Sequence, residues 1–253
     1  MDYDPKRARE LPQASMPDLE TWLDNMRRFM VHMQSLVHAR LEAGILDADD
    51  AEEFETKLAV DPPLAAESLG DLKSSLSCEL PPPLEEFFLT ASSGIGFHFA
   101  IDLGDAAPEG CPSWVRGGEL PYLPDPIFSA SKLNEFQADA RQYAATSGLA
   151  DFPEVQAVWD RCVPFFRFNN ADFLALDPID DAGDPYVVHL NHEGDPQLVS
   201  RNLASFLIEW PRVCYIGPGQ ISDLERFFDP KHRVLSGDVP AAIALREALE
   251  WEP

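Results

Sequence analysis

Apolar residues recur at intervals of three and four positions through the first part of the chain. Residues 15–43 carry the longest such stripe, and this spacing predicts an amphipathic helix with one buried face. Ser15 is placed to cap the helix, and Pro17 suits its first turn. Gly44 then provides a stop signal. The pattern therefore predicts a long N-terminal helix packed against the rest of the protein.

A shorter apolar stripe over residues 49–59 predicts a second helix that pairs with the first. The pair Pro62-Pro63 follows, and proline interrupts helical hydrogen bonding. We therefore expect a boundary here. Residues 1–62 would form an N-terminal helical hairpin, and residues 63–253 would form the main domain.

Further segments with helical spacing alternate with proline- and glycine-rich turns along the main domain. A serine or aspartate near the start of several of them could cap the helix. The predicted helices cover residues 65–76, 83–90, 131–146, 149–162, 202–210, 222–228 and 238–251. Residues 104–128, rich in glycine and proline, are expected to form loops.

A different pattern occupies residues 163–191, where short apolar runs are separated by polar turns. The runs at 163–168, 172–177 and 186–191 predict three strands, and 97–103 predicts an earlier one. The short turns favour an antiparallel meander over β-α-β crossovers. The sequence therefore predicts an α+β fold with a central, mainly antiparallel sheet flanked by helices.

The charge of the chain is unusual. Lys and Arg number 19 and Asp and Glu number 44, so the formal net charge is −25. Such a field repels phosphate backbones and anionic lipids, which argues against nucleic-acid and membrane partners. It favours encounter with a basic protein. The alternative is that the acidic surface serves solubility alone.

Targeting and cysteine signals indicate a soluble, cytoplasmic protein. The first residues lack the apolar stretch of a secretory signal, and no run is long enough to cross a membrane. The cysteines are far apart and lack a C-x-x-C motif, so we expect reduced thiols in place of disulfides or a zinc site. They are Cys78, Cys111, Cys162 and Cys214.

Motifs for catalysis or cofactor binding are weak. The aspartate-rich turn at 177–184 lacks the spacing of a calcium loop, and a general acid there would need burial. His189 and His192 lie on a strand and its turn, where they do not converge as helical metal ligands do. Residues 92–96 match neither a P-loop nor a dinucleotide fingerprint, and no G-x-S-x-G motif occurs. We therefore expect no enzyme activity, cofactor or metal.

The order of several motifs resembles the SUKH superfamily, in particular its cell-wall-assembly-regulator-like branch. The pattern begins with an L-P-x-x-L helix that ends in a turn with a small residue and Gly. A strand, a turn and a second apolar strand that ends in Asp follow. A Gly-rich turn then leads to a strand that ends near a His, and a helix with Ser-Phe comes last. The turn that commonly reads Gly-Gly-Asp is Asn170-Ala171-Asp172 here. The matching positions are Leu80-Pro81, Leu84, Phe87 to Leu89, Ser93-Gly94, residues 165–177, residues 183–192 and Ala204 to Phe206.

The resemblance implies a non-enzymatic protein-binding domain. Many bacterial members look like immunity proteins that neutralise a toxin, and fungal relatives regulate cell-wall assembly. We expect an immunity protein that neutralises a cognate basic toxin, such as a nuclease, by occluding it. The alternatives are an intracellular regulator or scaffold, and a hydrolase or metal-dependent enzyme that uses the Asp- and His-rich turns. The expected partner-binding residues are Asp177, Asp180, Asp181, Asp184, His192, Glu193 and Asp195.

Overall fold

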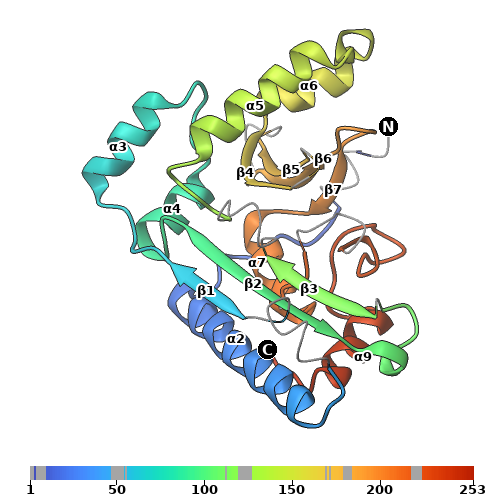
Figure 1. Cartoon of the computed structure of the whole chain (residues 1–253). Helices are drawn as coiled ribbons and strands as arrows, with labels where there is room; N and C mark the ends of the chain where they lie inside the picture. The colour runs from blue at the N-terminus through green and yellow to red at the C-terminus, as the bar shows by residue number, and fades with distance from the viewer. Residues whose placement is uncertain are drawn as a thin grey trace.

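The computed structural model confirms the α+β class, with two antiparallel sheets in place of one central sheet. Helices lie outside both sheets and between them (Figure 1). The residues that the structure describes are 3, 10–46, 54, 56–111, 113–118, 127–168, 170, 172–178, 184–217 and 224–253.

The first sheet has the strand order β1-β2-β3, with β1 (Lys57–Val60), β2 (Ile95–Asp102) and β3 (Trp114–Gly118). The prediction of a helix over 49–59 is therefore wrong at residues 57–59, which lie in β1. β1 pairs antiparallel with β2 through four residues, so backbone pairing with a distant segment overrides the local helical spacing. Residues 49–53 and 55 lie outside the described residues.

Strand β3 lies within residues 104–128, which were expected to form loops because they are rich in glycine and proline. Both glycines of β3 are required by close packing. A Cβ at Gly117 would lie 2.4 Å from the carbonyl oxygen of Tyr215, and Gly118 has φ +81°. Glycine thus allows the segment around residue 215 to approach the sheet.

The second sheet is the predicted meander, and each pair of neighbouring strands in it is antiparallel. It comprises β4 (Val163–Arg167), β5 (Phe173–Asp177), β6 (Tyr186–Leu190) and β7 (Gln197–Ser200). β7 was not predicted, because its four residues follow directly on a turn-rich segment.

Both faces of the second sheet are buried. Tyr186, Val188 and Leu190 face a cluster formed with α5 (Leu133–Thr146) and α6 (Pro153–Arg161). The opposite face joins the larger core beside α7 (Leu203–Arg212). Figure 1 shows α5 and α6 over one side of this sheet and α7 between the two sheets. Two-sided burial explains why β5 and β6 consist almost entirely of apolar residues.

The N-terminal helix α2 (Leu19–Glu42) is an integral part of the larger core. Asp18 caps it by accepting a 2.7 Å hydrogen bond from the backbone N–H of Thr21, so the expected cap at Ser15 is wrong. Met26 and Phe29 are fully buried in the core that also contains β2, α4 and α7. Leu58 and Val60 of β1 also pack against this core, so residues on both sides of the predicted boundary at 62 contribute to it.

Most of the remaining helices lie near their predicted positions, with boundaries shifted by a few residues. The helix predicted over 222–228 does not extend to its expected end, because Phe228 forms a β-bridge with Leu235. The last helix begins after Val239, so Asp238 is not its cap; Ser222 lies outside the described residues. These elements are α3 (Ala66–Ser75), α4 (Pro82–Thr90), α9 (Pro240–Ala248) and the 3-10 turns η2 (Gly104–Ala106) and η3 (Leu149–Asp151).

The four cysteines are free thiols, as expected. Cys162 and Cys214 are buried, and burial raises the pKa of both thiols, which keeps them protonated and unreactive. Within the described ranges, no helix combines the length and apolar character needed to span a bilayer.

One hydrogen bond joins α2 to α7. Pro211 lies inside α7 and has no N–H, so it cannot donate to the carbonyl of Leu207, four residues earlier. The indole Nε1–H of Trp22 donates to that carbonyl at 2.8 Å, in a buried position. The Trp22 ring also stacks on Trp210, with 6.3 Å between centroids. The N-terminal helix thus supplies the donor that the proline removes.

We predict that Trp22→Phe lowers the free energy of unfolding by about 2 kcal/mol more than Trp251→Phe, because only the first change leaves a buried carbonyl without a donor. Trp251 is a matched control, since its Nε1 has no partner in the described structure. Urea unfolding of both variants measures the difference.

The same bond can be tested through Pro211. Pro211→Ala restores an N–H that can donate to Leu207 within the helix, so Trp22→Phe should cost less in that background. Equal costs in both backgrounds would contradict the proposed role of Trp22.

Candidate functional site

The turn after β6 and the ends of α5 and α6 enclose a surface pocket of about 320 Å³. Three of the expected partner-binding residues line it together: His192, Glu193 and Asp195. The other wall comes from the end of α5 and the start of α6. The lining residues are Tyr143, Ser147, Leu149, Phe152, Val155, His192, Glu193, Gly194 and Asp195.

A buried carboxylate, Asp172, holds this turn in place. Its Oδ2 lies 2.9 Å from Nε2 of His189, and its Oδ1 lies 2.7 Å from Nδ1 of His192. The backbone N–H of His192 also donates to Oδ1 at 2.7 Å, and the Asn170 side chain donates to Oδ2 at 2.8 Å. Both carboxylate oxygens are therefore fully engaged, and the side chain is only 2% exposed.

The hydrogen bonds that Asp172 accepts keep its carboxylate ionised. Burial alone would raise the pKa of Asp172, but the bonds from His189 and from the backbone and ring of His192 lower it to about 2. Because the carboxylate accepts from both rings, Nε2 of His189 and Nδ1 of His192 carry the hydrogens. Nε2 of His192 is then directed away from Asp172, 3.5 Å from Oε1 of Glu193.

The opposite wall of the pocket is aromatic. The Tyr143 hydroxyl donates to the carbonyl of His192, which ties α5 to the turn. The Tyr143 ring packs on Trp159, with 4.7 Å between centroids, so its position is fixed from behind. Phe152 is 57% exposed at the start of α6. The pocket thus combines a fixed imidazole, a fixed phenol ring and an exposed phenyl ring with two carboxylates.

Asp177 does not belong to this surface, which corrects its inclusion among the expected partner-binding residues. Its side chain is fully buried and accepts two bonds from Arg161, at 2.6 and 2.7 Å, and one from the Tyr3 hydroxyl at 2.7 Å. Burial raises the pKa of Tyr3, and the Asp177 carboxylate adds to this effect. Asp177 therefore anchors the N-terminal segment to the second sheet.

Asp184 forms hydrogen bonds within the protein that join the N-terminal segment to the start of α7. Its Oδ2 accepts hydrogen bonds from the side chains of Gln13 and Asn202, at 2.8 and 3.0 Å. Asn202 in turn caps α7 by accepting from the N–H of Ser205. The two remaining expected residues, Asp180 and Asp181, lie outside the described residues.

The sequence interpretation missed Asp172, Tyr143 and Phe152 as site residues. Asp172 is 20 positions from His192 and reads as an ordinary turn aspartate, although Asn170 two positions earlier is a turn signal. Tyr143 and Phe152 have the spacing of core residues in predicted helices. Only the packing of α5 and α6 over β5 and β6 brings them to the turn.

Among the described residues, no group of three His, Cys, Asp or Glu side chains is arranged to hold a metal ion. His189 is fully buried and uses Nε2 on Asp172, while its Nδ1 has no partner in the described structure. The arrangement instead orients His192 at the pocket mouth, where its ring can donate or accept a hydrogen bond.

Comparison of the chain with models of known families, with curated proteins and with solved structures finds no match.

We predict that the ionised Asp172 carboxylate contributes about 2 kcal/mol to the free energy of unfolding, because the pKa of this group falls from 3.8 to about 2 on folding. For a lowered carboxylate pKa, this stability is present above about pH 4 and is lost as the pH falls through about 2. The difference in unfolding free energy between the wild type and Asp172→Asn should shrink over this range.

Urea unfolding at a series of pH values measures this difference. Glu193→Gln is the control, since it removes a carboxylate from the same turn whose side chain is 83% exposed and does not contact Asp172. A constant difference between wild type and Asp172→Asn down to pH 2 would contradict the assignment.

Proposed function

We propose that this protein is a non-enzymatic protein-binding factor that docks a basic partner at the pocket beside His192. The observation that carries the proposal is Phe152, a 57% exposed aromatic side chain at a pocket whose opposite side bears carboxylates. Exposed aromatic side chains surrounded by polar groups are typical centres of protein interfaces.

The charges around Phe152 favour a cationic partner. Glu193 and Asp195 lie across the pocket, and Asp151 and Glu154 flank Phe152 along the chain, with Asp151, Glu154 and Glu193 exposed. A lysine or arginine side chain placed here would meet carboxylates and the faces of aromatic rings, both of which attract cations. The net charge of −25 would also speed encounter with a basic protein.

The resemblance to the SUKH superfamily narrows the proposal to an immunity protein that occludes a toxin. Two of the positions that carry the resemblance, Asp172 and His192, are hydrogen-bonded to each other at 2.7 Å and shape the pocket. The proposed mechanism is steric and electrostatic: the acidic surface covers the basic surface of the partner and blocks its access to substrate. A basic nuclease is the expected class of toxin.

We predict that Glu154→Lys combined with Glu193→Lys weakens binding of the cognate partner at least tenfold, because like charges would face each other across the interface. The product of the adjacent gene is the first partner to test, by co-purification and by relief of toxicity on co-expression. Binding of the wild type should weaken as salt increases.

The matched control is Glu67→Lys combined with Asp71→Lys. These residues are exposed on α3, which lies at the left of Figure 1, apart from the α5–α6 tip at the top, and the change in net charge is the same. Equal loss in both double variants would mean that only overall charge matters. Binding without relief of toxicity would favour a regulator or scaffold over an immunity protein.

A hydrolase is the second candidate, and one observation favours it. Asp172 holds His192 through Nδ1, which leaves Nε2 available at a pocket, as in sites where histidine acts as a general base. We expect no hydrolysis of chromogenic esters or phosphodiesters above background. An activity lost in His192→Gln and retained in Glu193→Gln would replace the binding proposal.

A further inference from the structure

The His192 pocket offers a ligand mainly hydrogen-bond acceptors, because three of its donors are used within the protein. The Tyr143 hydroxyl donates to the carbonyl of His192. The backbone N–H of His192 donates to Asp172, and that of Glu193 donates to the side chain of Asn191 at 2.8 Å. No lysine or arginine is among the described residues that line the pocket. A ligand that pairs with these acceptors must therefore bring the donors.

Two of the acceptors lie side by side at the mouth of the pocket. Nδ1 of His192 carries the hydrogen that points to Asp172, at 2.7 Å, so Nε2 of the neutral ring has a lone pair and accepts. Oε1 of Glu193 lies 3.5 Å from this Nε2. Ligands can reach both atoms from solvent, since the His192 and Glu193 side chains are 26% and 83% exposed. Two acceptors this close share no hydrogen, and a group that donates to both would satisfy them together.

Aromatic rings form another part of the lining. Phe152 is exposed at the start of α6 and lines the same pocket as His192. The Tyr143 ring lies 6.4 Å from the His192 ring, and Trp159 packs behind it at 4.7 Å. A flat cation can therefore lie against a ring while its edge donates to the acceptors of the turn.

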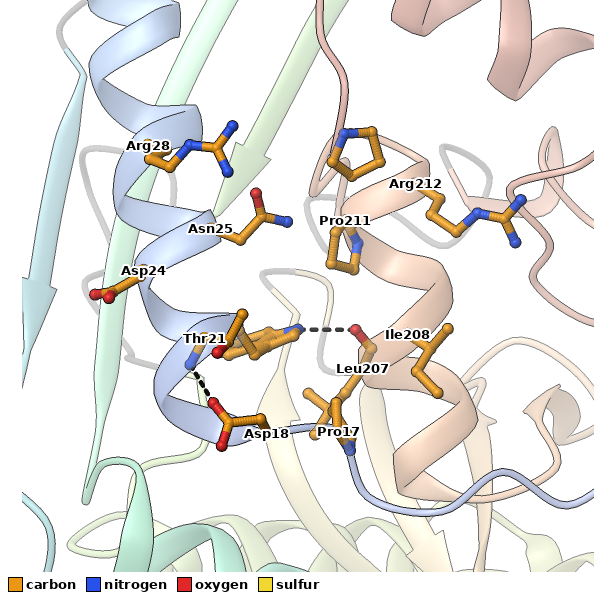
Figure 2. A pocket seen from close by; sticks show the side chains of 12 residues that line it. Pro17, Asp18, Thr21, Asp24, Asn25, Arg28, Leu207, Ile208, Pro211 and Arg212 are labelled. Atoms are coloured by element: carbon orange, nitrogen blue, oxygen red, sulfur yellow. Dashed lines mark hydrogen bonds between the residues drawn. The ribbon is translucent and has the colours of Figure 1, made fainter.

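A larger pocket, of about 580 Å³ between α2 and α7, has a different lining (Figure 2). Arg28 of α2 and Arg212 of α7 lie in it. Asp18 and Asp24 also lie there, so this pocket presents charges of both signs. The excess of acidic residues in the chain does not by itself produce a pocket without cationic side chains. The lining of the His192 pocket is thus a local property.

Building on the binding role proposed above, we infer that the His192 pocket selects an arginine side chain of the partner over a lysine. Two N–H groups on one edge of the guanidinium donate to Nε2 of His192 and Oε1 of Glu193, and its face packs on Phe152. A guanidinium has five N–H donors in one plane, whereas an ammonium directs its three donors apart and has no flat face. His192 is therefore a specificity-determining residue.

The test uses the full chain and three blocked alanine pentapeptides whose central residue is arginine, lysine or citrulline. Citrulline keeps the planar shape of the arginine side chain but is uncharged. Titration of the backbone amide NMR signals of residues 192–195 gives each dissociation constant. We expect the arginine peptide to bind about tenfold more tightly than either of the other two.

Two variants test the contacts. The amide of His192→Asn takes the place of Nδ1 and can still donate to Asp172, but this side chain has no atom at the position of Nε2. Phe152→Leu keeps an apolar side chain at an exposed position, where it does not disturb folding, and removes the flat face. Each variant should reduce the preference for arginine over lysine.

Glu154→Gln is the matched control. It removes a carboxylate two residues from Phe152 that does not line the pocket. It should therefore weaken the arginine and lysine peptides alike and leave the ratio of their dissociation constants unchanged.

Equal binding of the arginine and lysine peptides, or a preference that persists in either variant, would overturn the selection of arginine. Equal binding of the citrulline peptide, or absence of binding by all three peptides at millimolar concentration, would also overturn it. The binding function is decided separately by the cognate partner. A partner that binds the wild type and is weakened by Glu154→Lys with Glu193→Lys would uphold that function even where the preference for arginine fails.

Discussion

The buried bond between the Trp22 indole and the Leu207 carbonyl joins α2 directly to α7 inside the larger core. Pro211 makes that carbonyl available by removing its helical donor, so the helix that packs between the sheets carries an unsatisfied acceptor on one side. Trp22 satisfies it and packs with Trp210, Tyr215 and Phe87. One side chain thereby joins α2 to α7 and to α4, although α2 and α7 are far apart in the sequence.

The second sheet positions the His192 turn because helices cover both of its faces. α5 and α6 bury one face, and α7 buries the other, so β5 and β6 cannot shift without disturbing two cores. Asp172 immediately precedes β5 and His192 lies two residues after the end of β6, at the same end of these antiparallel neighbours. The sheet register therefore sets the distance between the carboxylate and the imidazole, and Tyr143 adds a bond from α5.

Local patterns predicted most of the helices and the meander, because their apolar spacing repeats over many residues, as in residues 19–42. They failed for β1, β3 and β7, which have four or five residues each and depend on pairing with distant strands. The candidate site was predicted only in part. His192, Glu193 and Asp195 are neighbours in sequence, but the buried role of Asp177 and the contacts of Asp172 and Tyr143 arise from tertiary packing.

A preformed pocket suits the proposed binding role. Asp172 accepts from the backbone and the ring of His192, and Tyr143 donates to its carbonyl, so three interactions fix a turn that would otherwise sample many conformations. Ordering a flexible turn on binding would weaken the complex, whereas a turn ordered by folding retains the full interaction energy. In the proposed role, the buried carboxylate would contribute to recognition without contacting the partner, because it holds the His192 turn in one conformation.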